Sequence, residues 1–221
     1  MMKVVISLGG SVISLYDMDF LKEFAKFLRK LDADAYVVVG GGKLARDYIN
    51  AARKFCRDEK FLDEIGIAAT RLNALLLASF FGKNIPHTIE DAAKLKPPVI
   101  MGGTTPGHST DAVAAMLAKY IKADMLIIAT NVDGIYDKDP TIYNDAKKYD
   151  RIKICKLKKI VGKEWKRAGK SMIIDAIACK IIEREKIRTI VLNGKNLENL
   201  ENAIYGKKFI GTEVDINDTP A

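Results

Sequence analysis

The sequence predicts an α/β fold in which a mostly parallel, open central sheet is covered by helices on both faces. Two observations predict it: short β-branched runs alternate along the chain with amphipathic segments, and glycine clusters stand at the ends of several of those runs. Strands that alternate with helices imply right-handed crossovers and a parallel sheet. No repeat, low-complexity segment or dividing linker interrupts the pattern, so we expect residues 1–221 to form one domain.

Five short aliphatic runs are expected as buried strands, namely Lys3 to Leu8, Tyr36 to Val39, Val99 to Met101, Met125 to Ala129 and Thr189 to Leu192. The first helix between them has Asp17 or Asp19 placed to cap it. Two further segments, Thr110 to Ile121 and Ile174 to Ile182, are also expected to be helical. We expect three apolar stripes at helical spacing to be core faces: Phe20, Phe24, Phe27, Leu28 and Leu31; Leu44, Tyr48, Ala52 and Phe55; and Phe61, Ile65, Ala69, Leu72 and Leu76.

Composition favours a cytoplasmic protein that does not enter a membrane. The chain is 48% hydrophobic and 29% charged, and no apolar run approaches the length that spans a bilayer. The N-terminal residues do not have the pattern of an export signal. The three cysteines, Cys56, Cys155 and Cys179, lie far apart without CxxC spacing, which is typical of thiols in a reducing compartment.

A net charge of +8 requires an explanation, and much of it lies between Lys147 and Lys170, where Asp150 and Glu164 are the only acidic residues. Such a segment attracts polyanions. No nucleic-acid-binding motif or series of interleaved aromatic residues accompanies it. A solvated face, or one that steers ATP, is therefore favoured over nucleic-acid binding.

Three glycine-rich loops follow predicted strands, at Gly9-Gly10, Gly40-Gly41-Gly42 and Gly102-Gly103. Ligands of open α/β sheets bind at the carboxyl ends of strands, and glycine lets backbone N–H groups approach phosphate oxygens closely. The GxGxxG dinucleotide fingerprint and the P-loop spacing are both absent. The loops thus predict a polyanion site of another type.

Several motifs carry a resemblance to a known family. They are Gly9 to Ser11, Val39 to Arg46, Pro106 to Ala115, and Ala129 to Tyr136 with Asp139-Pro140 behind it. Together they resemble the amino-acid-kinase superfamily, and the Pro106 to Asp111 stretch is similar to archaeal UMP kinases in particular. The resemblance runs from Lys3 to about Val214 and includes the segment Ser171 to Asp175.

The resemblance implies a three-layer αβα sandwich, with UMP bound in the N-terminal part and ATP in the C-terminal part, Mg²⁺ entering with ATP, and a homohexamer. It implies that the ATP phosphates contact Gly9, Gly10, Gly42 and Arg46, and that the adenosine is enclosed by Thr130, Asn131, Tyr136 and Asp139. For UMP it implies contacts from Gly41, Asp63, Thr104, Thr105, Pro106, Gly107, His108, Ser109 and Thr110, with Asp63 accepting from the ribose hydroxyls.

One position departs from the family pattern. Many relatives place a lysine two residues before the first glycine pair, where it neutralises the transferring phosphate, whereas this chain has Ser7 there. We expect Lys43 or Arg46, both in the second glycine segment, to supply the missing positive charge. An ionised phosphate acceptor needs no general base, so positioning and positive charge are the main requirements of the chemistry.

Some assignments stay open at this stage. Asp133 and Asp137 either approach a metal or form the turn around Gly134, and His108 either contacts substrate or packs its loop. His87 is interpreted as a packing residue, and the histidine spacing does not favour zinc. Two other functions compete: a kinase of the same superfamily for carbamate, isopentenyl phosphate or an amino acid, and a non-catalytic nucleotide- or oxyanion-binding protein.

Overall fold

The computed structural model describes residues 1–14, 17–161 and 174–217 and places seven strands of this part in one sheet, in the order β3-β2-β1-β4-β6-β7-β5. The pairs are parallel except for β6 with β7, which confirms the mostly parallel open sheet. All five expected strands are present, and the two short strands β5 and β7 extend the sheet beyond them. The strands are β1 (Lys3–Leu8), β2 (Asp34–Val39), β3 (Val99–Met101), β4 (Met125–Thr130), β5 (Arg151–Lys153), β6 (Thr189–Asn193) and β7 (Thr212–Asp215).

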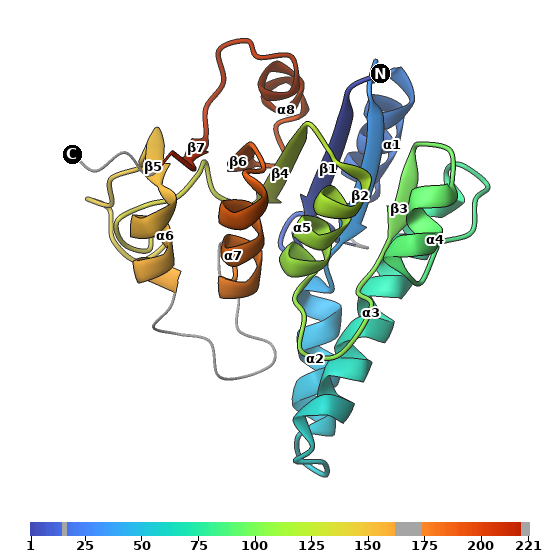
Figure 1. Ribbon diagram of the computed structural model, residues 1–221. Helices are drawn as coiled ribbons and strands as arrows, with labels where there is room; N and C mark the ends of the chain where they lie inside the picture. The colour runs from blue at the N-terminus through green and yellow to red at the C-terminus, as the bar shows by residue number, and fades with distance from the viewer. Residues whose placement is uncertain (15–16, 162–173, 218–221) are drawn as a thin grey trace.

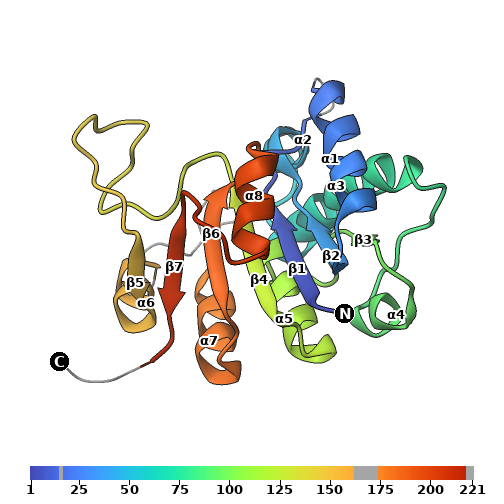
Figure 2. The same ribbon diagram turned by 90° about the horizontal axis from the view of Figure 1, so that it is seen from above.

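Helices cover both faces of the sheet, which gives the three-layer αβα sandwich (Figures 1 and 2). One face packs against α1 (Met18–Lys30), the C-terminal half of α3 (Glu59–Ser79) and α8 (Leu197–Ile204). The other packs against α4 (Ile89–Lys94), α5 (Thr110–Ile121), α6 (Ile154–Val161) and α7 (Ala176–Glu185). The remaining described helix, α2 (Gly42–Ala52), pairs with α3.

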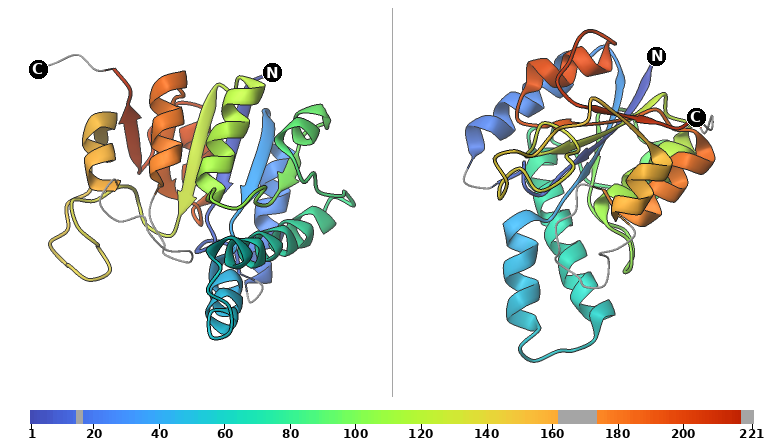
Figure 3. Two further views of the ribbon diagram at one scale, coloured as in Figure 1. Left: turned by 60° about the horizontal axis from the view of Figure 1, so that its bottom comes forward. Right: turned by 90° about the vertical axis from the view of Figure 1, so that its left-hand side faces the viewer.

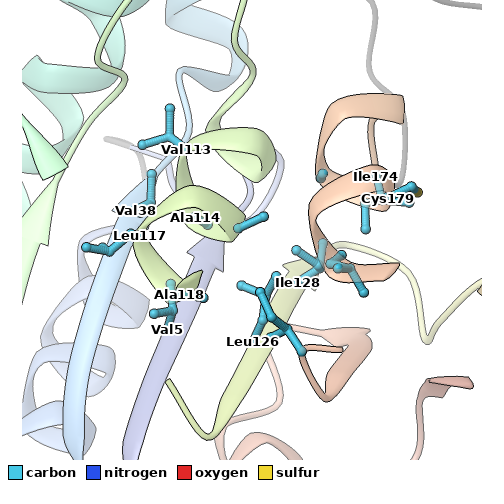
Figure 4. Packing of buried hydrophobic residues seen from close by; sticks show 14 of the residues in the cluster. Val5, Val38, Val113, Ala114, Leu117, Ala118, Leu126, Ile128, Ile174 and Cys179 are labelled. Carbon is cyan, nitrogen blue, oxygen red and sulfur yellow. The ribbon is translucent and has the colours of Figure 1, made fainter. Parts of the chain in front are cut away.

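The strand residues divide between these two cores by simple alternation. In β1, Val4, Ile6 and Leu8 face the layer of α1, whereas Val5 faces the layer of α5. Figure 4 shows the second core, where Val113 and Leu117 of α5 lie over the strand residues. This alternation also turns Ser7, which is completely buried, towards α5.

Capping side chains fix where the helices begin. Of the two candidates at α1, Asp17 is the cap, because its carboxylate accepts from Phe20 N–H at 3.3 Å. Ser109 caps α5 by accepting from Ala112 N–H at 3.1 Å, and Asp175 caps α7 by accepting from Ala178 N–H at 2.7 Å. The last two caps lie at the carboxyl end of the sheet, so they also shape the site described below.

The predicted core faces of α2 and α3 are partly wrong. Tyr48, Phe55, Phe61 and Leu72 are 62%, 91%, 52% and 56% exposed. The reason is visible in Figure 3: these two helices project as a hairpin past the end of the sheet, where no further layer covers their outer sides. They bury a narrower stripe against one another, formed by Ala45, Ile49, Leu62 and Ala69.

The described part of the basic segment is a largely solvent-exposed face, in which some of the basic residues form ion pairs. Arg151 pairs with Glu213 at 3.1 Å, and Lys158 with Glu183 at 2.7 Å. Its remaining residues, Lys163 to Lys170, and most of the family-like segment that ends at Asp175 lie outside the described residues. Within the part of the chain that is described, no helix combines the length and apolarity needed to cross a bilayer.

Candidate active site

The glycine loops converge because the strands that precede them are neighbours in the sheet. The strands β3, β2, β1 and β4 lie side by side and run parallel, so their carboxyl ends share one edge. Backbone hydrogen bonds continue into the loops, from Gly9 N–H to the Ala129 carbonyl at 2.8 Å and from Gly40 N–H to the Leu8 carbonyl at 2.9 Å. From β1 the chain continues to β2 and β3 on one side and later to β4 on the other, so the direction of the connections reverses between β1 and β4. Open α/β sheets bind ligands at such a point.

A cleft of about 230 Å³ lies between these loops and brings together most of the predicted site residues. The predicted residues that line it are Gly9, Gly10, Gly41, Gly42, Arg46, Asp63, Gly107, His108, Ser109, Thr110 and Thr130. The predicted residues absent from its lining are Lys43, Thr104, Thr105, Pro106, Asn131, Tyr136 and Asp139. Polar residues outside the prediction that line it are Ser11, Thr70, Asp111 and Asp175.

The first and second glycine loops touch through their backbones. A Cβ atom added at Gly10 would lie 2.0 Å from the amide nitrogen of Gly42, and one at Gly42 would lie 2.2 Å from the Gly10 carbonyl oxygen. Gly42 also has φ of +60°, in the left-handed region. Side chains are thus excluded from both positions, and the floor of the cleft is bare backbone.

The two candidate cations differ in their surroundings. Arg46, one turn into α2, lines the cleft, and its side chain has no ion pair or hydrogen bond within the described residues. Lys43, which is exposed as Arg46 is, forms an ion pair with Asp47 at 2.5 Å on the surface of the same helix. Of the two candidate cations, Arg46 therefore lines the cleft and Lys43 does not.

The loop that follows β3 is tied to α3. Asp63 accepts from Gly107 N–H at 2.8 Å, and Gly107 has φ of +85°. The His108 ring lies 3.0 Å from the Thr105 hydroxyl, so this histidine both lines the cleft and contacts its own loop. Thr104 and Pro106 border a separate hollow beside α3, together with His87.

The residues after β4 mainly build their own loop. Asp139 accepts from the Thr141 amide at 2.8 Å and hydroxyl at 2.7 Å, and these bonds lower the pKa of its carboxyl group. Tyr136 forms a bridge to Lys148. Asp137 accepts from Lys147 N–H at 2.8 Å, ten residues along the chain, and so connects the two sides of this loop. Asp133 accepts from the Asn193 side chain at 3.1 Å.

Two carboxylates line the cleft, and each accepts from a serine hydroxyl. The Ser7 hydroxyl donates to Asp111 at 2.6 Å, and the Ser109 hydroxyl donates to Asp175. Withdrawal of the Asp111 carboxyl group from water raises its pKa to about 7; the Ser7 hydrogen bond opposes this rise, and the charge of Asp175 adds to it. Serine at position 7 thus supplies a donor to Asp111 but no positive charge.

The raised pKa of Asp111 predicts a pH-dependent stability. Between about pH 4 and 7 the folded chain keeps the Asp111 proton that the unfolded chain has released, so this group's contribution to stability falls across that range as pH rises and is lost above about pH 7. We expect Asp111→Asn to raise the free energy of unfolding at pH 8 by on the order of 2 kcal/mol, and to change it little at pH 4. Urea unfolding of the parent protein and of Asp111→Asn at both pH values, in the presence of a metal chelator, measures these free energies. An equal effect at the two pH values would contradict it.

Two polar residues of α3 hold the glycine loops through hydrogen bonds to the loop backbone. The Thr70 hydroxyl accepts from Gly103 N–H at 2.7 Å. The Asn73 side-chain amide donates to the carbonyls of Gly40 and Gly41 at 2.9 and 3.2 Å. A signal for both was present in the sequence, since a polar side chain in the buried stripe of a helix requires a hydrogen-bonding partner.

Comparison with known proteins relates the chain to one family. The model of the amino acid kinase family matches residues 2–193. A uridylate kinase of Archaeoglobus fulgidus is 49% identical over 221 residues, which covers 96% of this chain and 100% of that protein. A uridylate kinase of Thermococcus kodakarensis is 47% identical over 225 residues and covers 97% and 100% of the two chains.

Solved structures give the same result. The crystal structure of the uridylate kinase from Archaeoglobus fulgidus has a TM-score of 0.86 at 48% sequence identity, and covers 97% of this chain and 100% of that chain. A UMP kinase from Ureaplasma parvum, 22% identical, has a TM-score of 0.76, covers 97% and 98% of the chains, and shares the fold.

Proposed function

The chain belongs to the amino acid kinase family, and from that premise we propose that it is a uridylate kinase, which transfers the γ-phosphoryl group of ATP to UMP to give UDP and ADP. Full-length similarity to uridylate kinases supports UMP as the phosphoryl acceptor. The observation that carries the reaction type is the cleft in which the glycine loops meet. A bare-backbone floor suits two phosphate groups brought within bonding distance.

The cleft meets the main requirement of this chemistry, which is to hold two polyanions in line. Gly10 and Gly42 lie in backbone contact, so phosphates on either side of that contact would be close to one another. The start of α2 at Gly42 and of α5 at Thr110 adds helix N-termini at the same place. Arg46 supplies a cationic fork suited to phosphate oxygens. The acceptor phosphate is already ionised, so no side chain must remove a proton.

The donor set of the cleft also fits Mg²⁺ that enters with ATP. No three His, Cys, Asp or Glu side chains gather into a metal cluster within the described ranges. Mg²⁺ needs only one or two carboxylates when phosphates complete its shell, and Asp111 and Asp175 both line the cleft. The ion, when bound, neutralises phosphate charge in place of the family lysine. The role of the chain is then to hold two oxygen-bearing side chains at the right place, with Ser7 and Ser109 orienting them.

A panel assay tests the proposal and separates it from its rivals. The protein is incubated with ATP, Mg²⁺ and, in turn, UMP, CMP, AMP, isopentenyl phosphate, carbamate and glutamate. We expect UMP to be the preferred acceptor. Preference for another acceptor would support a different amino acid kinase, and nucleotide binding without any turnover would support the non-catalytic alternative.

We also propose, on the family pattern alone, that the enzyme is a cytoplasmic homohexamer.

The recognition of ribose gives a sharper prediction. One oxygen of Asp63 holds Gly107, and the carboxylate lines the cleft, so its other oxygen can accept from a ribose hydroxyl. We expect kcat/KM to be about 10- to 100-fold higher for UMP than for dUMP, because a site built to bond a hydroxyl penalises its absence. Asp63→Asn keeps an acceptor for Gly107 and should narrow the gap. The exposed neighbour variant Glu64→Gln is the control, and equal efficiency of the parent on both nucleotides would remove Asp63 from this role.

A further inference from the structure

Asn73 is a buried polar residue of α3 that does not line the cleft. It is 5% exposed and stands among apolar neighbours of the same helix, such as Ala74 and Leu77. Asparagine is a poor helix former and costs free energy when buried without partners. Its side-chain amide has two N–H donors, and it donates to two successive carbonyls, those of Gly40 and Gly41.

These two bonds help to fix which way the loop amides point. The Gly40 carbonyl shares a peptide plane with the N–H of Gly41, and the Gly41 carbonyl shares one with the N–H of Gly42. In a trans peptide the N–H points opposite to the C=O. Since both carbonyls are held towards α3, both N–H groups point away from it. Gly41 and Gly42 line the cleft, whereas Asn73 lies behind them.

A Gly-Gly-Gly segment cannot maintain this orientation by itself. Glycine has no Cβ and adopts positive and negative φ about equally well, so its peptide planes rotate at little steric cost. A rotated plane would present a carbonyl oxygen to the cleft, where it would repel a phosphate group. The Asn73 amide opposes that rotation at the Gly40–Gly41 plane, and at the Gly41–Gly42 plane it does so together with Ala45 N–H, which donates to the Gly41 carbonyl at 3.1 Å.

We propose that Asn73 is a positioning residue for phosphoryl transfer, which fixes the amides of Gly41 and Gly42 towards the reacting phosphates. The same helix holds the facing loop, since Thr70 accepts from Gly103 N–H at 2.7 Å and Arg71 donates to the Gly103 and Thr104 carbonyls at 3.1 Å. α3 is therefore a common support for the two loops. The inference rests on the proposed function only for the identity of the phosphates as those of ATP and UMP. The orientation of the Gly41 and Gly42 amides does not depend on it.

The test replaces the amide by an apolar group of similar volume, Asn73→Leu. We expect kcat for UMP phosphorylation to fall by at least about tenfold while the KM values for ATP and UMP change less, because preorganised donors act most on charge that develops in the transition state. Asn199→Leu is the matched control. Asn199 is 8% exposed, and its side-chain amide likewise bonds to backbone: it donates to the Ile210 carbonyl and accepts from the Ile210 N–H, both at 2.7 Å. It lies in α8, however, and does not line the cleft.

Thermal unfolding of each variant separates a stability effect from a kinetic one. If Asn73→Leu is folded and its kcat stays within twofold of that of Asn199→Leu, the proposal is wrong. If Asn73→Leu does not fold at the assay temperature, Asn73→Ser, which keeps one donor on a shorter side chain, carries the same comparison. For that variant we expect at least about a threefold loss of kcat, and a parental kcat would overturn the proposal.

A second readout keeps this inference distinct from the proposed function. Failure of the parent to phosphorylate UMP would refute the proposed function but leave the geometry of Asn73 to be tested. In that case titration calorimetry with Mg²⁺ and ADP measures phosphate binding directly. Asn73→Leu is expected to weaken binding at least about fivefold relative to Asn199→Leu, and equal affinities would overturn the inference.

Discussion

Gly10→Ala is expected to lower kcat/KM by about 100-fold or more. The added methyl group would lie 2.0 Å from the Gly42 amide nitrogen and 2.4 Å from its Cα, whereas ordinary contacts begin at 3.4 Å. The obstructing atoms are backbone, so no side chain can rotate away, and the two loops must separate by more than an ångström. A displacement of about 1 Å between reacting groups commonly costs about 100-fold in rate. Steady-state kinetics with UMP and ATP measure the loss.

A glycine elsewhere provides the control for Gly10→Ala. Gly206 has φ of +68° with no atom within 4 Å of an added Cβ, so Gly206→Ala should cost about 1–2 kcal/mol of backbone strain and leave kcat/KM unchanged. Circular dichroism and thermal unfolding establish that both variants fold. A folded Gly10→Ala protein that keeps kcat/KM within threefold of the parent would show that the loops need not touch for catalysis.

The main strands and the glycine loops could be predicted from sequence because their signals are local. A β-branched run that ends in glycines, such as Lys3 to Gly10, indicates where a strand ends and, in the adjacent residues, where the backbone is open to a ligand. The short strands β5 and β7 lacked such a signal. β5 is Arg-Ile-Lys with only the isoleucine buried, and it is surrounded by other basic residues.

The partners of the residues that support the site could not be predicted, since they lie far away along the chain. Asn73 and Gly40 are 33 residues apart, and Ser7 and Asp111 are 104 residues apart. From the sequence, Ser7 indicated only that the family's positive charge is missing at this position. The fold shows that the Ser7 hydroxyl donates to a carboxylate of the cleft. The exposed Tyr48 and Phe61 illustrate the converse, because helical spacing identifies an apolar face but not whether another layer covers it.

The position of Arg46 separates two candidates that the sequence left equivalent. Both Lys43 and Arg46 follow the second glycine loop, but Arg46 lines the cleft, whereas Lys43 lies outside the lining and pairs with Asp47 at 2.5 Å. With serine at position 7, that position offers no positive charge to the transferring phosphoryl group. Within the described residues Arg46 has no carboxylate partner of its own, so its guanidinium group is available to phosphate oxygens.

We therefore expect Arg46→Ala to lower kcat/KM by about 100-fold, a loss of about 2.7 kcal/mol of transition-state stabilisation, and Lys43→Ala to lower it less than threefold. If Arg46 acts mainly in the transition state, kcat and kcat/KM fall together, whereas a role confined to holding ATP would raise its KM alone. Arg46→Lys keeps the charge but not the planar fork and should lie between the parent and Arg46→Ala. Both constants are measured at saturating Mg²⁺ for all three variants. A larger loss in Lys43→Ala than in Arg46→Ala would transfer the role to Lys43, and less than a threefold loss in both would leave the compensation for Ser7 to Mg²⁺ and the backbone amides alone.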